Sequence, residues 1–102
     1  RRTKSYAEIV RFPESERDIA LVVGLSVPSS TIQKIIERHK LVKSSNPVDV
    51  YVGEGITRGK KSIAYRIVFQ SIRSTLTTEL LYRAEGDILR QLQREVGAEL
   101  RT

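Results

Sequence analysis

The pattern of apolar and polar residues along this chain predicts six secondary-structure elements. Alternation with a period of two predicts β-strands over residues 41–52 and 62–70, and a run of β-branched and apolar residues before a turn predicts a buried strand over 18–25. Residues 98–101 are the candidate for a short last strand. Spacings of three and four residues predict one helix over 29–39 and a longer one between the loop 71–77 and Gly97. Ser30 and Gln33 have the spacing of a capping box for the first helix, and Gly97 is well placed to end the second.

The order of these elements indicates the fold class. Strand, helix, strand, strand, helix, strand is the order of the ferredoxin-like α+β sandwich, a βαββαβ fold in which two helices cover one face of an antiparallel four-stranded sheet. A chain of 102 residues fits one such domain. We assign residues 18–102 to the domain and the polar stretch 1–17 to an N-terminal lead-in segment, whose apolar residues could cover part of the core: Tyr6, Ile9, Val10 and Phe12.

The period of two also predicts which side chains lie on the sheet face away from the helices. The aliphatic set expected to pack under the helices is Ile19, Leu21, Val23, Val48, Val50, Val52, Ile63, Ile67, Phe69 and Leu100. The opposite, open face then carries Asp49, Tyr51, Ser62, Ala64, Arg66 and Arg101, beside Ala20 and Val22. One aromatic ring, one carboxylate, one hydroxyl and two guanidinium groups would share this face.

Charge and composition narrow the class of function. The 18 Lys and Arg residues against 12 Asp and Glu give a formal net charge of +6, which favours a polyanionic partner. The chain has no Cys and a single His, His39, so we predict neither a catalytic residue nor a metal site. No apolar run approaches the roughly 20 residues that span a bilayer, and we expect a soluble protein of the cytoplasm or an organelle. Because the chain lacks Met, we also expect it to be part of a longer protein.

The predicted open face has the chemistry that reads single-stranded RNA. Such proteins stack an unpaired base on an aromatic ring and hydrogen-bond its edge. Tyr51 would supply the ring, and Asp49 would accept hydrogen bonds from N1–H and the amino group of guanine, while adenine offers an acceptor at N1. Arg66 would lie on the same face, and Lys60 and Lys61 in the expected hairpin loop would contact phosphates.

Simpler interpretations of the same residues stay open. Tyr51 could be a packing residue of its strand, since aromatic residues favour strands in any case. Asp49 could form a cross-strand ion pair with Arg66, and Ser62 and Arg101 could be solvated strand ends. A glycine-rich hairpin with several cations is often only a mobile turn.

Several segments resemble one known family. They are RDIALVV at 17–23, DVYVGEGITRGKKSIAYRIVFQ at 49–70, STLT at 74–77 and GAELR at 97–101. In order and spacing they are similar to the C-terminal ferredoxin-fold anticodon-binding domain of the phenylalanyl-tRNA synthetase β subunit, and the similarity covers about 12–102.

The resemblance implies a function and its residues. By position, Asp49, Tyr51, Ser62 and Arg101 match the family residues that bind the first anticodon base, a guanosine of tRNA-Phe. The implied partners are the tRNA-Phe anticodon loop and, through the rest of the β subunit, the α subunit, which uses ATP and magnesium for phenylalanylation. The domain itself would be non-catalytic and hold no cofactor. The alternative is a protein-interaction or assembly module of the same fold.

Overall fold

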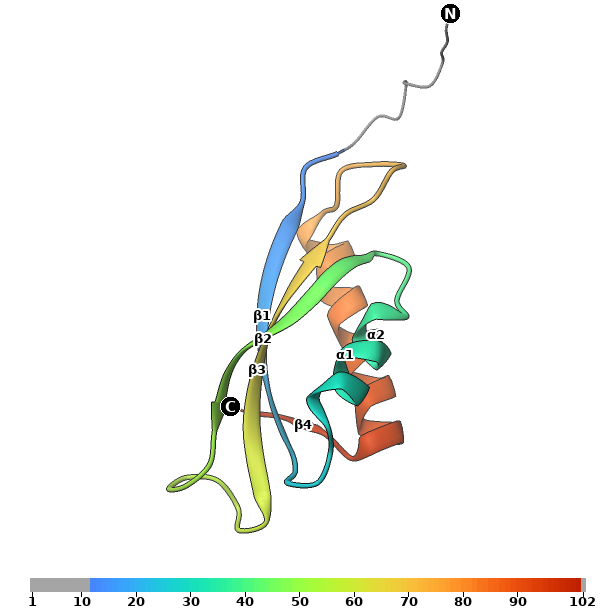
Figure 1. Ribbon diagram of the computed structural model, residues 1–102. Coiled ribbons are helices and arrows are strands. Elements are labelled where there is room, and N and C mark those ends of the chain that lie inside the picture. Colours follow the sequence, from blue (N-terminus) through green and yellow to red (C-terminus); the bar gives the residue numbers. More distant parts are fainter. Residues whose placement is uncertain (1–11, 102) are drawn as a thin grey trace, which may run out of the picture.

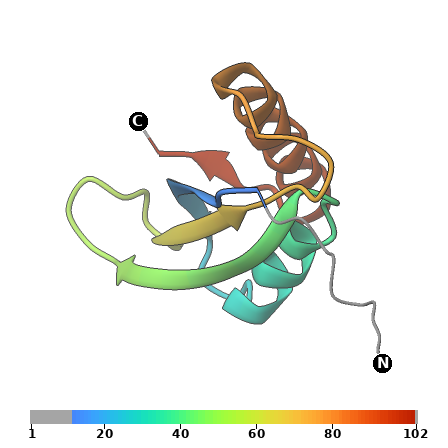
Figure 2. The ribbon, with the colours of Figure 1, turned by 90° about the horizontal axis from the view of Figure 1, so that it is seen from above.

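The structure is a computed structural model that describes residues 12–101, and it contains the six predicted elements in the predicted order. They are β1 (Ser15–Gly24), α1 (Ser29–Glu37), β2 (Val42–Tyr51), β3 (Lys60–Phe69), α2 (Thr78–Val96) and β4 (Glu99–Leu100). The strands form one antiparallel sheet in the order β2, β3, β1, β4. Both helices lie on the same side of this sheet (Figures 1 and 2). The ferredoxin-like α+β fold is confirmed.

The core lies between the sheet and the two helices. Most of the aliphatic set predicted to face the helices is buried there: Ile19, Leu21, Val23, Ile63, Ile67 and Phe69. The helices contribute Ile32, Ile35 and Ile36 from α1 and Leu81, Ala84, Ile88 and Leu92 from α2. Tyr65 is absent from the predicted set but is fully buried among these residues. No helix of residues 12–101 is long and apolar enough to cross a membrane.

Four predicted core residues are exposed, and the expectation for them is wrong. Val48, Val50 and Val52 are 48%, 57% and 58% exposed. The far end of the β2–β3 hairpin extends past both helices (Figure 1), and residues 48–52 are the part of the chain that leads into this end. Leu100 is 49% exposed because β4 has only two residues and forms an edge of the sheet. Strand alternation alone does not reveal how far the helices reach.

Both ends of α1 also differ from the prediction. Pro28 occupies the N-cap position and no side chain caps the helix. Ser30 is already inside the helix and forms no capping box, and Gln33 instead donates a hydrogen bond to the carbonyl oxygen of Ser45 (2.7 Å). The helix ends at Glu37, two residues before the predicted end.

The remaining boundaries are close to the expectations. Strand β1 begins at Ser15, so residues 15–17 of the predicted lead-in segment belong to the sheet, while residues 1–11 lie outside the described residues. Thr77 caps α2 by accepting a hydrogen bond from the backbone N–H of Leu80 (3.1 Å). Gly97 ends α2 as predicted, with a φ of 68°, a left-handed conformation that glycine adopts without steric cost.

The buried hydroxyl of Tyr65 is satisfied by the first residue of α1. The Tyr65 hydroxyl donates to the carbonyl oxygen of Ser29 (3.0 Å), and its oxygen lies 2.7 Å from the Ser29 hydroxyl. Burial raises the pKa of Tyr65 above 10.0, and the hydrogen bond with Ser29 opposes this shift. The pair joins the start of α1 to the middle of β3.

We expect Tyr65→Phe to lower the free energy of unfolding by about 1 kcal/mol, because the buried hydroxyl bonds are lost. The matched control is Tyr82→Phe, since Tyr82 is 78% exposed. Urea titrations of both variants and the parent chain measure the difference.

The same variants test the raised pKa of Tyr65. A raised folded-state pKa stabilises the fold below the ordinary value of 10.0, and this contribution is lost as the pH rises through the folded-state value. Above pH 10 the stability of Tyr65→Phe should therefore fall less steeply than that of Tyr82→Phe. Equal slopes would contradict the role of burial at Tyr65.

Candidate nucleic-acid interface

The strand register arranges the open sheet face into three cross-strand rows. From β2 through β3 to β1 the rows are Tyr51–Ser62–Val22, Asp49–Ala64–Ala20 and Asn46–Arg66–Asp18. We call them the first, second and third rows. Ala64 and Ala20 are small, so the middle of the second row is lower than the first and third rows.

Two residues of the first row form a cluster with Arg101, which follows β4. The guanidinium carbon of Arg101 lies 5.5 Å from the centroid of the Tyr51 ring, within the range of a cation–π contact. The same guanidinium donates a hydrogen bond through Nη1 to the Ser62 hydroxyl (3.3 Å). Ser62 is only 3% exposed, while Tyr51 remains 39% exposed. The structure thus brings Tyr51, Ser62 and Arg101 together.

The loop that follows β2 orients the Tyr51 ring. The Tyr51 hydroxyl donates a hydrogen bond to the carbonyl oxygen of Glu54 (2.8 Å). Gly53 has a φ of 136°, and a Cβ atom at this position would lie 3.4 Å from the Tyr51 hydroxyl. Gly53 and Glu54 are absent from the predicted site. The glycine two residues after an exposed aromatic residue could have indicated that the following loop packs against the ring. They hold the ring in one orientation.

Asp49 lies in the second row, beside the cluster, and its carboxylate is exposed. It faces Ala64 across the strand pair, and it forms no ion pair with any residue of 12–101. The simpler interpretation, an ion pair between Asp49 and Arg66, is therefore wrong. Asp49 keeps its acceptor oxygens free of a cationic partner from the described chain.

Arg66 is bound instead to Asp18, which is absent from the predicted site. Its Nε and Nη2 donate to the two carboxylate oxygens of Asp18 at 3.0 and 3.2 Å. The hydrogen bonds from Arg66 and its positive charge hold the pKa of Asp18 below its ordinary value of 3.8. The pairing with Asp18 also raises the pKa of Arg66. Arg66 is thus on the predicted face, two rows away from Tyr51.

Lys60 and Lys61 are strand residues, and the expectation that they lie in the hairpin loop is wrong. They are the first two residues of β3, and both are half-buried. Alternation places Lys60 on the same face as Ser62. Lys61 pairs with Val23, whose side chain is in the core, and so it lies on the helix side. Only Lys60 of the two shares the open face.

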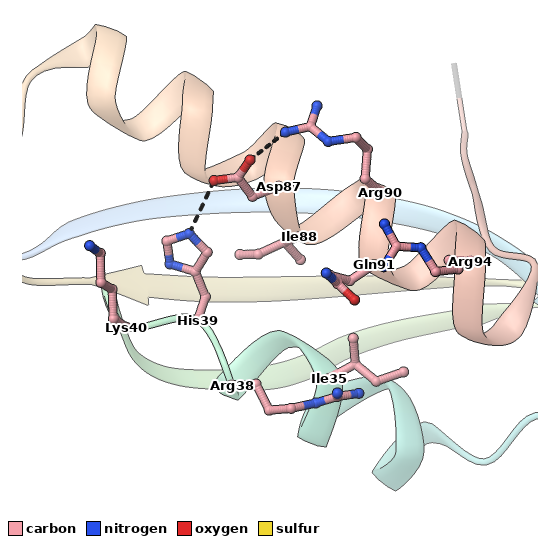
Figure 3. A pocket seen from close by; sticks show the side chains of 9 residues that line it. All are labelled: Ile35, Arg38, His39, Lys40, Asp87, Ile88, Arg90, Gln91 and Arg94. Atoms are coloured by element: carbon pink, nitrogen blue, oxygen red, sulfur yellow. Dashed lines mark hydrogen bonds and ion pairs between the residues drawn. The ribbon is translucent and has the colours of Figure 1, made fainter.

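His39 lies on the other side of the molecule, beside a hollow of about 550 Å³ between the end of α1 and α2 (Figure 3). Its Nδ1 accepts a hydrogen bond from the backbone N–H of Leu41 (3.2 Å), which leaves the proton on Nε2, 3.6 Å from Asp87. Asp87 also pairs with Arg90. No Ser, Thr or Cys lines the hollow, and no group of three potential ligands within residues 12–101 could hold a metal ion.

Comparison with known proteins identifies a family. Residues 10–101 match the ferredoxin-fold anticodon binding domain. The phenylalanine–tRNA ligase β subunit of Dehalococcoides mccartyi is 37% identical over 99 residues, which are 97% of this chain and 12% of that protein. The β subunit of Staphylococcus haemolyticus is 39% identical over 95% of this chain and 12% of its own length. That of Clostridium tetani is 38% identical over 96% of this chain and 13% of its own length.

The chain thus spans about an eighth of the length of these curated relatives. The family match extends over nearly all of the chain and includes each of the six elements and the three rows of the open face. The family's description names a ferredoxin fold, and the antiparallel four-stranded sheet with two helices on one face is consistent with it. The chain belongs to the ferredoxin-fold anticodon binding domain family.

Proposed function

We propose that the open sheet face binds the anticodon loop of tRNA-Phe and stacks the first anticodon base, a guanosine, on Tyr51. The observation that carries the proposal is the half-exposed, preoriented Tyr51 ring, with Asp49, Ser62 and Arg101 beside it. A base stacked on an aromatic side chain contributes about 1–3 kcal/mol. A ring already held by its own loop loses less conformational entropy on binding.

The polar groups around the ring match the edges of guanine. Asp49 accepts from N1–H and the exocyclic amino group, and its carboxylate has no competing ion pair among the described residues. Arg101 supplies donors, and guanine O6 and N7 are both acceptors. Ser62 is 3% exposed in the RNA-free chain and accepts a hydrogen bond from Arg101, so its hydroxyl can donate to the base once Arg101 has moved aside. Adenine would present an acceptor to Asp49.

Arg101 and the base compete for the same side of the Tyr51 ring. The guanidinium lies over that ring in the RNA-free chain. A base that lies flat on Tyr51 must move the guanidinium aside, where it can reach O6 and N7, or hold it on its own outer surface. Either position keeps the positive charge next to the RNA, and Arg101 then contributes to affinity through both charge and stacking.

The proposal places the chain within a larger enzyme. The relatives are β subunits of phenylalanine–tRNA ligases, and we infer that this chain supports the ATP-dependent phenylalanylation of tRNA as part of such a ligase. Residues of other parts of that enzyme would bind ATP and magnesium, and the rest of the β subunit would join this domain to the α subunit. The formal charge of +6 favours the RNA partner.

The proposal predicts separate effects for two substitutions. Tyr51→Ala should weaken binding of an anticodon stem-loop with a GAA anticodon by about 1–3 kcal/mol, since a stacking surface is lost. Asp49→Asn should mainly reduce the preference for guanine over adenine at the first anticodon position. Both effects are measured by fluorescence anisotropy with two stem-loops, one with a GAA anticodon and one with adenine at its first position. Tyr82→Ala, on the helix side, is the control aromatic substitution.

A salt titration separates this function from a protein-contact module. RNA binding should weaken steeply with salt because counterions are released, whereas an apolar protein interface responds little. Unchanged stem-loop binding in both Tyr51→Ala and Asp49→Asn, with normal folding, would refute base recognition by this face.

A further inference from the structure

The ion pair in the third row has the shape of a second stacking surface. Asp18 engages Arg66 through Nε and Nη2 together, so two parallel hydrogen bonds fix the plane of the guanidinium. The two side chains remain about half exposed, at 49% and 55%. Planar guanidinium groups stack on the unpaired bases of RNA much as aromatic rings do. An arginine whose plane is fixed by two hydrogen bonds and whose side chain is half exposed can therefore act as a stacking surface as well as a charge.

The space between the two stacking surfaces suits an extended RNA strand. Successive rows on one face of a strand are two residues apart, so the first and third rows are four residues, about 13 Å, apart along β3. Ala64 and Ala20 keep the middle of the second row low, between Asp49 at the β2 edge and Arg101 at the β4 edge, whose guanidinium is turned toward Ser62 and Tyr51 of the first row. An unstacked strand that places one base on Tyr51 can therefore continue along the face toward the third row.

The third row also offers hydrogen-bonding groups for a base edge. Asn46 lies opposite Arg66 on β2 and is exposed. Its amide has both donors and an acceptor, and it can pair with an adenine edge. The acids around Arg66 are Asp18 and Glu16, the latter contributing to the raised pKa of Arg66. With these carboxylates nearby, Arg66 is a poor site for a phosphate and a better one for a neutral base.

We propose that Arg66, oriented by Asp18, stacks a second base of the same RNA loop, within two nucleotides of the base on Tyr51. This inference rests on the proposed function, because it needs the loop to lie along the open face. It gives Asp18 a positioning role and extends the recognised RNA from one base to two.

The orientation of Arg66 can be tested without RNA. The carboxyl pKa of Asp18, measured by NMR titration, should lie below 3.8 and should return toward that value in Arg66→Ala. With a lowered folded-state pKa, the pair stabilises the fold above pH 3.8 and the contribution is lost as the pH falls through the folded-state value. An Asp18 pKa that does not change in Arg66→Ala would show that the pair does not form in solution.

The main experiment is anisotropy with stem-loops that carry one abasic nucleotide at successive loop positions. Arg66→Ala should weaken binding of the intact loop on the order of tenfold. The abasic change at one position near the first anticodon base should cause a similar loss, and the two losses should not add. Arg66→Lys, which keeps the charge but not the plane, should bind as weakly as Arg66→Ala. Arg90→Ala, which breaks an exposed ion pair on the helix side, is the matched control and should bind normally.

Asp18→Asn gives the sharpest outcome, because two explanations predict opposite signs. Removing a negative charge strengthens binding if Arg66 only attracts phosphates. It weakens binding if Asp18 orients a stacking plane, and weaker binding is what we expect. Tighter binding in Asp18→Asn, or a full recovery in Arg66→Lys, would overturn the second stacking surface.

Failure of the inference is distinguishable from failure of the proposed function. A substitution is coupled to a loop position when its loss of binding and that of the abasic change do not add. If Tyr51→Ala is coupled to one position and Arg66→Ala to none, the first base site stands and the second stacking surface is wrong. If neither substitution is coupled to any position, the proposed function fails as well. Thermal unfolding of each variant shows whether it is folded. We expect little change in the unfolding temperature of the Asp18 and Arg66 variants, because both side chains are about half exposed.

Discussion

The register of the central β1–β3 pair is the constraint on which the other features depend. Ten residues of each strand pair without interruption, from Ser15 with Phe69 to Gly24 with Lys60. A slip of one residue would move every side chain of a strand to the opposite face. In this register Leu21 and Ile63 meet under the helices, while Ala20 and Ala64 meet on the open face. The buried set therefore determines which residues remain available to a ligand.

The two outer strands add their side chains to this frame by different routes. Strand β2 pairs with β3, but its register shifts between Pro47 and Asp49, and this shift leaves Asp49 opposite Ala64. Arg101 arrives from the other edge of the sheet. The left-handed turn at Gly97 ends α2 and directs the chain into β4, after which the backbone N–H of Arg101 donates to the carbonyl oxygen of Ala20 (2.8 Å). From there the guanidinium crosses the face to Ser62 and Tyr51.

The two faces of the molecule also use their charges differently. On the helix side, Asp87 and Glu95 neutralise Arg90 and Arg38. On the open face the third row is neutralised within itself, since Asp18 binds Arg66. The net charge is thus a poor guide to where an anion would bind, because several cations already have partners. Asp49 and Arg101, near the Tyr51 ring, are among the charged groups of the open face that form no ion pair within residues 12–101.

Local sequence determined the elements, their order and the face on which Asp49, Tyr51, Ser62 and Arg66 lie. Strand alternation and helical spacing depend on neighbouring residues, so they can be read without the fold. The tertiary structure decided three other features. It left Val48, Val50 and Val52 exposed, paired Arg66 with Asp18, and placed Arg101 over Tyr51. Each of these depends on segments far apart in the chain. Asp18 and Arg66 are 48 residues apart, and Arg101 and Ser62 are 39 apart, and only the packed sheet brings them into contact.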